Sequence, residues 1–301
     1  MKVQVLMSTY NGEKYLSQQI DSILKQKDVE VSLLIRDDGS SDATKAIIQD
    51  YCRNDSRVSW YSGKNLKSAG SFFDLAKNAG DADYYAFSDQ DDVWTEDKLI
   101  TAVKTLENKD NKIPQLYYCN MEVVDQNLAF LRFLHRNVKR TDYRYSVLIE
   151  YYAAGCTMVF NPEARKTYVE NLPFGGIMHD IWMEIICQFF GNVTYDKTAH
   201  IKYRQHSNNV IGVPTSRKQQ VIRKLRRIVD PDKQPRYAFA QIIYENLASK
   251  LNKDDLREVL RIVKYKDGLA NWMSLLFDRR IKASSFKDDF KFRFLVLLRR
   301  I

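Results

Sequence analysis

The chain has 301 residues, of which 45% are hydrophobic and 28% are charged, a balance that is ordinary for a soluble globular protein. A chain of this length can bury a sizeable core, and it fits one large domain or one domain with an appendage. No segment approaches the roughly 20 apolar residues that a membrane-spanning helix needs, and the start of the chain lacks the apolar run of a signal peptide, so we expect neither.

The net charge of +9 is concentrated in the last third of the chain. From Pro214 onward there are 22 Lys and Arg residues against 10 Asp and Glu residues. Residues 1–213 contain 25 Lys and Arg residues against 28 Asp and Glu residues. We therefore expect two regions with different roles, residues 1–213 and a helical, basic region over residues 214–301.

The four cysteines lie far apart in the sequence and follow no metal-binding spacing. They are Cys52, Cys119, Cys156 and Cys187. Because their sequence neighbours are apolar, we expect buried free thiols and a reducing compartment.

Strand-like and helix-like segments alternate along residues 1–213, which predicts an α/β fold with a mainly parallel sheet covered on both faces. Short apolar runs predict strands at Val3–Met7, Val31–Ile35, Val58–Tyr61, Tyr84–Phe87, Leu116–Cys119, Cys156–Phe160 and His200–Arg204. Helical spacing, capping residues and a proline predict helices that begin near Leu16, at Ser41 or Asp42, at Ser71, at Thr95, at Pro162 and at Ile181. The stretch from Gly63 to Gly70 predicts a loop, and Gly191 should end the last of these helices.

Three polar loops follow predicted strands, at Thr9–Glu13, Asp37–Ser40 and Asp89–Asp92. In open α/β sheets ligands bind beyond the carboxyl ends of the strands, so we expect these loops to lie together at a ligand site. The third loop has three interpretations: a site for a hard divalent cation, an acidic turn leading into the next helix, or a solvated loop without a role. The apolar residues on both sides of the loop and the second acidic pair at Asp37 favour the cation site.

The stretches "STYNGEKYLSQQIDSILKQ", "IRDDGSSDAT", "FSDQDDVW", "HDIW" and "YRQHSNNVIG" follow one another in this order over residues 1–213. Together they resemble an inverting family 2 glycosyltransferase with the Rossmann-like GT-A fold. The forms "SDQDDVW" and "YRQHSNN" are most similar to bacterial rhamnosyltransferase-type enzymes that build capsules, cell-wall polysaccharides or O-antigens.

The resemblance implies a nucleotide-sugar donor whose leaving phosphate is neutralised by Mg²⁺ or Mn²⁺. It implies Asp91 as the direct cation ligand and Asp89 facing the ribose or the water shell of the cation, while Asp92 either binds the cation instead or supports the loop. It matches Asp37 and Asp38 to residues that bind the base and the ribose. Further donor contacts are implied at Thr9, Tyr10, Asn11 and Glu13, and in a closing loop at Lys64, Asn65 and Lys67, for which simple turn chemistry is the alternative.

An inverting transfer needs a general base that takes the proton of the acceptor hydroxyl. The resemblance implies Asp180 as this base, with a plain helix N-cap as the alternative. The family often has a second acid before this position, where the present chain has His179, and it places Gly155 and Cys156 opposite the acceptor. Two aromatic residues beside carboxylates are either sugar-stacking platforms or core residues, namely Trp94 and Trp182.

The last motif offers two further donor contacts. Arg204 can fork onto a pyrophosphate, and His206 can supply a neutral ring nitrogen to the cation. Asn208, Asn209 and Gly212 suggest a loop that orders when the donor binds. His135 and His200 have no comparable support.

Three interpretations compete for the basic region: an amphipathic module on an anionic membrane surface near a lipid-linked acceptor, homo-oligomerisation, and nucleic-acid binding. The acidic character of the first region argues against nucleic acid, and we expect the membrane surface. Apolar residues alternate with cationic ones near the end of the chain, at Phe290, Phe292, Phe294, Leu295, Leu297 and Leu298 beside Lys291, Arg293, Arg299 and Arg300.

The sequence therefore predicts a metal-dependent inverting glycosyltransferase that works in the cytoplasm, peripherally on the inner face of the membrane. Its first candidate donor is dTDP-L-rhamnose, and its acceptor a growing surface polysaccharide. The alternatives are the same fold with a UDP-hexose donor, a catalytically silent glycan-binding or scaffold protein, and a nucleotidyltransferase. The intact Asp91, Asp180 and Arg204 argue against a silent protein, and the single glycine of "STYNGEKYL" argues against the phosphate loop of a nucleotidyltransferase.

Overall fold

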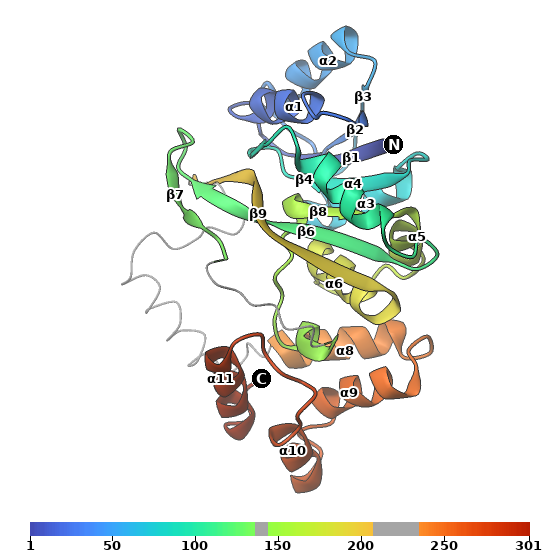
Figure 1. The fold of residues 1–301 in the computed structure, drawn as a ribbon, viewed down its shortest axis with the longest axis vertical. Helices are drawn as coiled ribbons and strands as arrows, with labels where there is room; N and C mark the ends of the chain where they lie inside the picture. Colours follow the sequence, from blue (N-terminus) through green and yellow to red (C-terminus); the bar gives the residue numbers. More distant parts are fainter. Residues whose placement is uncertain (136–143, 207–234) are drawn as a thin grey trace. The chain divides into compact units, whose positions relative to one another are not determined.

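The computed structural model of the protein describes residues 1–135, 144–206 and 235–301, and the chain divides into two compact units (Figure 1). The first unit comprises residues 1–136, 152–172 and 177–205, and the second comprises residues 137–151, 173–176 and 206–301. The predicted boundary between residues 213 and 214 lies outside the described residues.

The described part of the first unit is built on one nine-stranded sheet with the order β3-β2-β1-β4-β8-β6-β9-β5, to which β7 is added beside β6. The strands are β1 (Lys2–Thr9), β2 (Glu30–Asp37), β3 (Val58–Ser62), β4 (Tyr84–Ser88), β5 (Val93–Trp94), β6 (Gln115–Val124), β7 (Phe130–Phe133), β8 (Met158–Phe160) and β9 (Asn192–Arg204). Each predicted strand is present, and β5 and β7 are additional. The α/β class is therefore confirmed.

The parallel half of the sheet sets the position of the polar loops. Strands β3, β2, β1 and β4 are parallel neighbours, with Thr9 paired to Asp37 and Met7 paired to Ser88. The loops after β1, β2 and β4 consequently leave the sheet at the same edge. Strands β5, β7 and β8 run antiparallel to their neighbours, which the sequence pattern did not predict.

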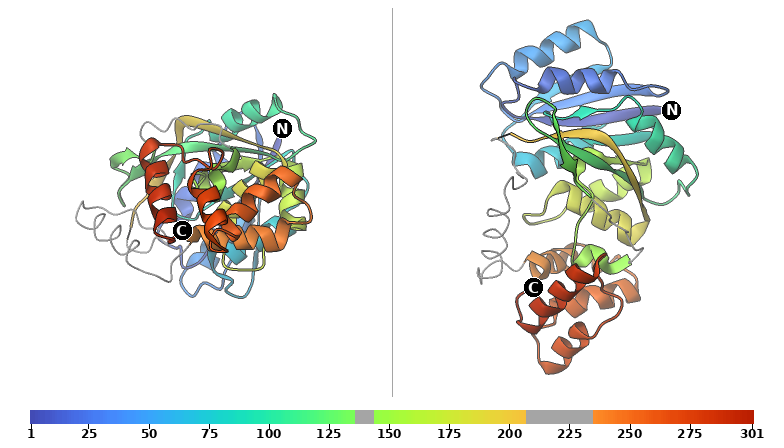
Figure 2. Two further views of the ribbon diagram at one scale, coloured as in Figure 1. Left: turned by 90° about the horizontal axis from the view of Figure 1, so that it is seen from below. Right: turned by 60° about the vertical axis from the view of Figure 1, so that its left-hand side comes forward.

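Helices cover both faces of this sheet (Figure 2). On one face α1 (Leu16–Leu24), α2 (Thr44–Asn54) and α4 (Lys98–Glu107) pack on alternate strand residues, so that Val5 of β1 shares a core with Ile20 and Leu99. The other face carries α3 (Lys67–Asn78), α5 (Pro162–Glu170) and α6 (His179–Phe190), which also contact one another. Side chains alternate between faces along each strand, which is why runs such as "VQVLM" are buried on both sides.

Several predicted element ends move in the structure. Helix α3 already begins at Lys67, so the loop after β3 is shorter than predicted. The predicted Thr95 cap is wrong, because α4 begins at Lys98 and its N-cap is Asp97. Pro162 occupies the first turn of α5, and Gly191 follows the end of α6, as predicted.

The described part of the second unit is helical, as predicted. It contains the 3-10 helix η1 (Arg144–Leu148) and the helices α8 (Pro235–Leu247), α9 (Lys253–Val263), α10 (Leu269–Leu276) and α11 (Phe286–Leu297). Asn252 caps α9, and the buried Asp255 forms an ion pair with Arg144 at 2.7 Å. Among the described helices none is both long and apolar enough to cross a membrane. All four cysteines are described and are free thiols; Cys52 is half-buried and the others are buried.

Candidate active site

The three loops at the sheet edge are joined by side-chain hydrogen bonds. Gln90 accepts a hydrogen bond from the Tyr10 N–H at 2.9 Å and donates one to the Tyr10 carbonyl oxygen at 3.1 Å. Asn11, whose φ is 47°, donates its N–H to Ser40 Oγ and accepts from the Ser41 N–H, both at 2.9 Å. The predicted convergence of the loops is thus present. Gln90 had no sequence signal beyond its place between two acidic residues.

The residues after β1 that were predicted to contact the donor differ in how far their side chains are exposed. Thr9 is buried, and its hydroxyl lies 3.4 Å from the Arg36 carbonyl oxygen. Glu13 accepts the N–H of Ala43 at 2.9 Å. Tyr10 has 49% of its surface exposed, so its ring is accessible to a ligand.

Asp37 and Asp38 after β2 are both buried and bonded to protein donors. Asp37 accepts from the Ser40 N–H at 3.2 Å and from the Ser62 hydroxyl at 3.0 Å. Asp38 pairs with the Arg36 guanidinium and accepts the Leu66 N–H at 2.8 Å. In this structure the two carboxylates therefore fix the loops after β2 and β3, and their contact with a nucleotide stays a prediction.

The loop that was predicted to close over the nucleotide shows turn chemistry. Asn65 Oδ1 accepts the Lys67 N–H at 3.1 Å, and Lys67 has a φ of 60° where α3 begins. Lys64, Asn65 and Lys67 are all exposed, and the Lys64 carbonyl oxygen accepts a hydrogen bond from Arg36 at 2.9 Å. The loop is thus anchored at its start while its polar side chains face solvent.

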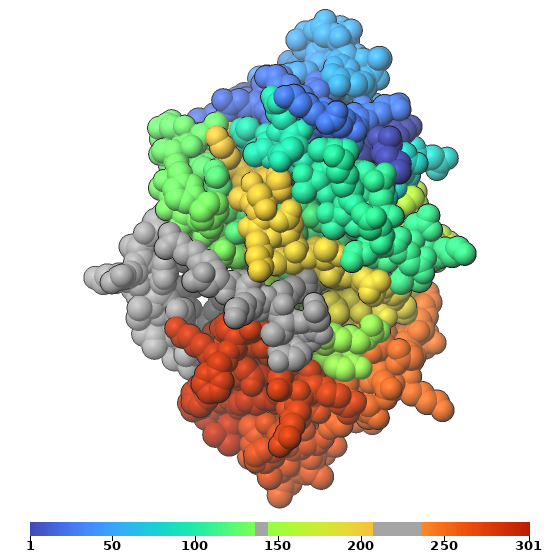
Figure 3. All heavy atoms as spheres, in the orientation of Figure 1, coloured from blue at the N-terminus to red at the C-terminus, as the bar shows by residue number. Residues whose placement is uncertain are grey.

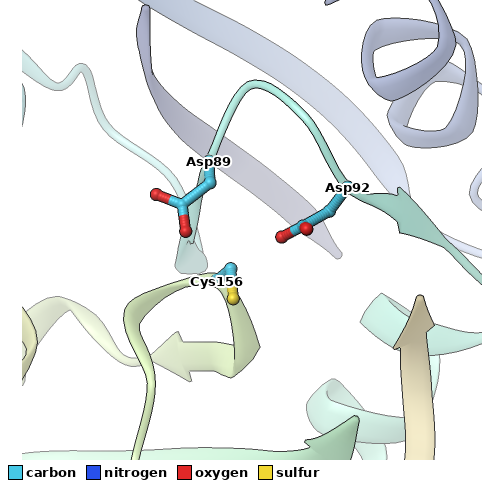
Figure 4. A group of neighbouring side chains, drawn as sticks. All are labelled: Asp89, Asp92 and Cys156. Atoms are coloured by element: carbon cyan, nitrogen blue, oxygen red, sulfur yellow. The ribbon is translucent and has the colours of Figure 1, made fainter. Parts of the chain in front are cut away.

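Asp89 and Asp92 form a compact cluster with Cys156, which lies in the 3-10 turn η2 (Gly155–Thr157) before β8. Ligand atoms of these three side chains lie within 4.8 Å of one another, and Figure 4 shows the two aspartates on one loop with Cys156 on the turn opposite. Asp92 is fully buried; its Oδ1 accepts the Arg204 N–H at 3.1 Å, while its Oδ2 has no hydrogen-bond partner among the described residues.

Burial and mutual repulsion disturb the protonation of this cluster. Burial, with the charges of Asp91 and Asp180, raises the pKa of Asp89 to about 7. Burial, with the charges of Asp91 and Asp89, raises the pKa of Asp92 well above its usual value, and burial also raises that of the Cys156 thiol. Carboxylate oxygens suit Mg²⁺ or Mn²⁺, whereas a protonated thiol does not, so the carboxylates fit a hard cation and Cys156 does not.

Trp94 lies in the core beside this cluster. Only 4% of its surface is exposed, and the Nζ atom of the buried Lys98 lies 3.2 Å from the centre of its ring. Burial lowers the pKa of Lys98 to about 8. The ring is therefore not an accessible platform for a sugar, and the core interpretation of Trp94 holds in this structure.

Asp180 lies in the first turn of α6, next to the acidic cluster. The N-cap of α6 is Met178, so the alternative of a plain cap at Asp180 is wrong. Asp180 Oδ1 accepts the N–H of Ile181 at 2.8 Å, and its Oδ2 accepts the N–H of Gly155 at 3.2 Å. Gly155 precedes Cys156 of the acidic cluster, so Asp180 lies beside this cluster, and its charge contributes to the raised pKa of Asp89.

The other predicted acceptor residues on α6 are buried. His179 stacks on Phe72 with ring centres 3.9 Å apart, burial lowers its pKa, and neither ring nitrogen has a hydrogen-bond partner among the described residues. Trp182 is fully buried and donates its indole N–H to the Asn171 carbonyl oxygen at 2.8 Å. Both rings therefore lie in the core, and their contact with an acceptor stays a prediction.

Arg204 at the end of β9 holds the acidic loop in place through hydrogen bonds of its guanidinium group. Its guanidinium donates from Nε to the Asp91 carbonyl oxygen at 2.8 Å, from Nη1 to the Gln126 carbonyl oxygen at 2.6 Å and from Nη2 to Gln18 Oε1 at 2.6 Å. Its side chain is buried and each nitrogen donates to the protein, so in this structure Arg204 fixes the acidic loop, and its contact with a pyrophosphate stays a prediction.

Beyond Arg204, the described part of the motif "YRQHSNNVIG" ends at His206. His206 follows β9 by two residues, is half-buried and belongs to the second unit, so its role as a ligand stays a prediction. The predicted donor-ordered loop at Asn208, Asn209 and Gly212 lies outside the described residues.

Comparison with protein families gives a match to the family described as "Glycosyl transferase family 2" over residues 4–167, more than half of the chain. RfbG of Shigella flexneri, named a dTDP-rhamnosyl transferase, is 29% identical over 231 residues, covering 70% of this chain and 75% of RfbG. An uncharacterized glycosyltransferase of Nostoc is 31% identical over 234 residues, covering 73% of this chain and 70% of the Nostoc protein. WfgD of Escherichia coli, named a UDP-Glc:alpha-D-GlcNAc-diphosphoundecaprenol beta-1,3-glucosyltransferase, is 29% identical over 157 residues, covering 52% of this chain and 58% of WfgD.

Two solved structures share the fold at low sequence identity. TarS from S. aureus has a TM-score of 0.56 at 16% identity, over 93% of this chain and 76% of the TarS chain. The mannosyltransferase PcManGT from Pyrobaculum calidifontis, solved with GDP-Man and Mn²⁺, has a TM-score of 0.53 at 18% identity, over 91% of this chain and 71% of the PcManGT chain.

Proposed function

The chain belongs to glycosyl transferase family 2 and has the GT-A fold, and on this premise we propose that it transfers a sugar, with inversion, from a nucleotide donor held at the strand ends of the first unit. One observation carries the proposal. The Gly155 N–H donates to Asp180, and the next residue, Cys156, lies against Asp89 and Asp92. Two consecutive residues thus join a candidate base to the acidic loop.

Asp180 is the general base of the proposed reaction. The acceptor hydroxyl forms a bond to the anomeric carbon while the bond from that carbon to the donor phosphate breaks, and Asp180 takes the hydroxyl proton. The N–H groups of Gly155 and Ile181 fix the orientation of the carboxylate. Its half-buried position leaves it partly accessible to an acceptor.

The acidic loop is the proposed site of a divalent cation, Mg²⁺ or Mn²⁺. When bound, the cation would offset the negative charge on the leaving phosphate. We assign its direct contact to Asp91, with Asp89 facing the ribose or the water shell of the cation; both carboxylates are half-buried, whereas Asp92 is fully buried. The raised pKa of Asp89 supports this assignment, because a cation would relieve the repulsion among these carboxylates.

The first candidate donor is dTDP-L-rhamnose, and the first candidate acceptor is a lipid-linked glycan of a bacterial surface polysaccharide. The name of RfbG supports the donor, while the name of WfgD supports a UDP-hexose as the alternative and a diphosphoundecaprenol-linked acceptor. The exposed ring of Tyr10 is a candidate surface for the nucleotide base. A silent scaffold is disfavoured, because the acidic loop and Asp180 are held together.

Calorimetric titration of dTDP and UDP, each with Mn²⁺ or with EDTA, tests donor binding. We expect one nucleotide to bind at least about tenfold more tightly with Mn²⁺, and Asp91→Asn to remove that gain. Asp50→Asn, an exposed carboxylate on α2, is the matched control and should behave as the wild type. Equal binding of both nucleotides with and without cation would contradict the assignment.

A further inference from the structure

Helix α11 exposes a line of large apolar side chains. Phe286, Phe290 and Phe294 have 89%, 65% and 46% of their surfaces exposed, and Leu297 and Leu298 continue the line at 50% and 44%. Steps of three and four residues place these side chains on one face of the helix. We refer to these five residues as the α11 stripe.

A different face of α11 holds the helix in the second unit. Phe292, Leu295 and Val296 are buried, and the indole N–H of Trp272 donates to the Val296 carbonyl oxygen at 2.8 Å. The helix is therefore apolar on two faces, of which one packs and the other faces solvent. The α11 stripe is not explained by the packing of the unit, and exposed apolar patches of this kind mark interaction surfaces.

Helix α10 presents a second, shorter apolar line. Leu269, Met273 and Phe277 recur every four residues and have 66%, 39% and 68% of their surfaces exposed. The guanidinium of Arg293 on α11 donates to the Leu275 carbonyl oxygen at 2.8 Å, which ties the two helices together. Figure 3 shows the residues of both helices, coloured red, at the surface of their unit.

The charges around the α11 stripe are mainly positive. Residues 286–301 contain five Lys and Arg residues, of which Lys287, Lys291, Arg299 and Arg300 are exposed, against two aspartates. The Ser285 hydroxyl donates a hydrogen bond to Asp288 Oδ2 with an O···O distance of 2.5 Å. Asp289 Oδ1 lies 3.6 Å from Nη2 of Arg293. A second copy of the chain would bring like charges together, whereas anionic headgroups attract Lys and Arg side chains near the membrane surface.

We propose that the exposed apolar face of α11, supported by α10, docks on an anionic membrane surface. The phenylalanine rings enter the boundary between headgroups and acyl chains, and the flanking Lys and Arg side chains contact the anionic headgroups. The proposal is independent of the donor and of the catalytic carboxylates, and it places the enzyme where a lipid-linked acceptor would be.

Vesicle flotation of the full chain tests the proposal. The protein should float with phosphatidylcholine vesicles that contain phosphatidylglycerol and remain below with phosphatidylcholine alone. The triple variant Phe286→Ser, Phe290→Ser, Phe294→Ser should lose at least about tenfold in vesicle affinity, because three large apolar side chains would no longer be buried at the membrane surface. Deletion of the helix is not a suitable test, because it would also remove the buried Phe292, Leu295 and Val296.

A matched triple variant, Phe130→Ser, Leu131→Ser, Phe174→Ser, removes three other exposed apolar side chains and should float as the wild type does. Thermal unfolding of both variants should match the wild type, and sugar transfer to a soluble acceptor should be unchanged, which separates this proposal from the catalytic one. The proposal is overturned if the wild type does not float with anionic vesicles or if the α11 variant floats equally well. It is also overturned if light scattering shows a dimer that the α11 variant dissociates while vesicles bind neither protein.

Discussion

At the residue scale, Arg204 fixes the acidic loop to two distant segments of the chain. Its buried guanidinium contacts the acidic loop, α1 through Gln18 and the turn after β6 through Gln126.

Substitution of Arg204 by Lys should loosen the acidic loop, because an ammonium group cannot donate in three directions with the geometry of a guanidinium. We expect a loss of about 2 kcal/mol in the free energy of unfolding, measured with urea, and a larger loss in cation-stimulated nucleotide binding. Arg165→Lys is the matched control, since Arg165 also donates to backbone oxygens, of Ala76 and Ala79, at a distance in sequence from the loop. Equal effects of both variants on nucleotide binding would show that Arg204 does not position the loop.

The raised pKa of Asp89 makes the stability of the metal-free protein depend on pH. The native state holds a proton on this carboxyl up to about pH 7, whereas the unfolded chain releases it near the ordinary value of about 4, so the native state binds more protons between these values. The free energy of unfolding should therefore fall as the pH rises from about 4 to about 7, by at most about 4 kcal/mol, because one pKa unit corresponds to about 1.4 kcal/mol.

Asp89→Asn should flatten this dependence, and saturating Mn²⁺ should reduce it, because a cation lowers the pKa of a carboxyl. Urea unfolding at several pH values, with and without Mn²⁺, measures both effects. A wild-type stability that rises over the same pH interval would contradict the assignment.

At the element scale, the turn η2 before β8 connects the two halves of the site. The sequence predicted a strand from Cys156, but the strand begins at Met158, and Gly155 and Cys156 form a turn that contacts Asp180 on one side and the acidic cluster on the other. A Cβ atom on Gly155 would lie 2.4 Å from Nε2 of His179, whose ring is held by stacking on Phe72. The glycine is therefore required for the close approach of η2 to α6.

Gly155→Ala should displace η2 or the His179 ring, and thereby move Asp180 relative to the acidic loop. We expect a loss of about 1–3 kcal/mol in stability and a fall in transfer rate of more than tenfold. Gly80→Ala is the control, because the heavy atoms nearest to its Cβ would be 3.9 Å away on the Gln4 side chain, and it should leave both quantities unchanged. Wild-type transfer by Gly155→Ala would show that this approach is not needed.

At the scale of the whole molecule, the sequence pattern predicts the parallel half of the sheet and its helices, because each strand is a continuous apolar run followed by a helix with one apolar face. Strand β5 could not be predicted because it has only two residues. The antiparallel direction of a strand could not be predicted either, because it depends on pairing between segments that are distant in the sequence. The convergence of three loops follows from topology and was predictable. The burial of Asp92, Trp94 and His179 was not, because it depends on how both helical layers close over the sheet.

The proposed transfer depends on Asp180 as its general base, and the Asp180→Asn enzyme is the decisive variant. The transfer rate to acceptor and the dissociation constant of the nucleotide with Mn²⁺ are measured on the same preparation, beside Asp50→Asn. We expect transfer by Asp180→Asn to fall at least about a thousandfold, with nucleotide affinity within about threefold of the wild type. Transfer by Asp180→Asn at a rate near that of Asp50→Asn would show that Asp180 is not the base.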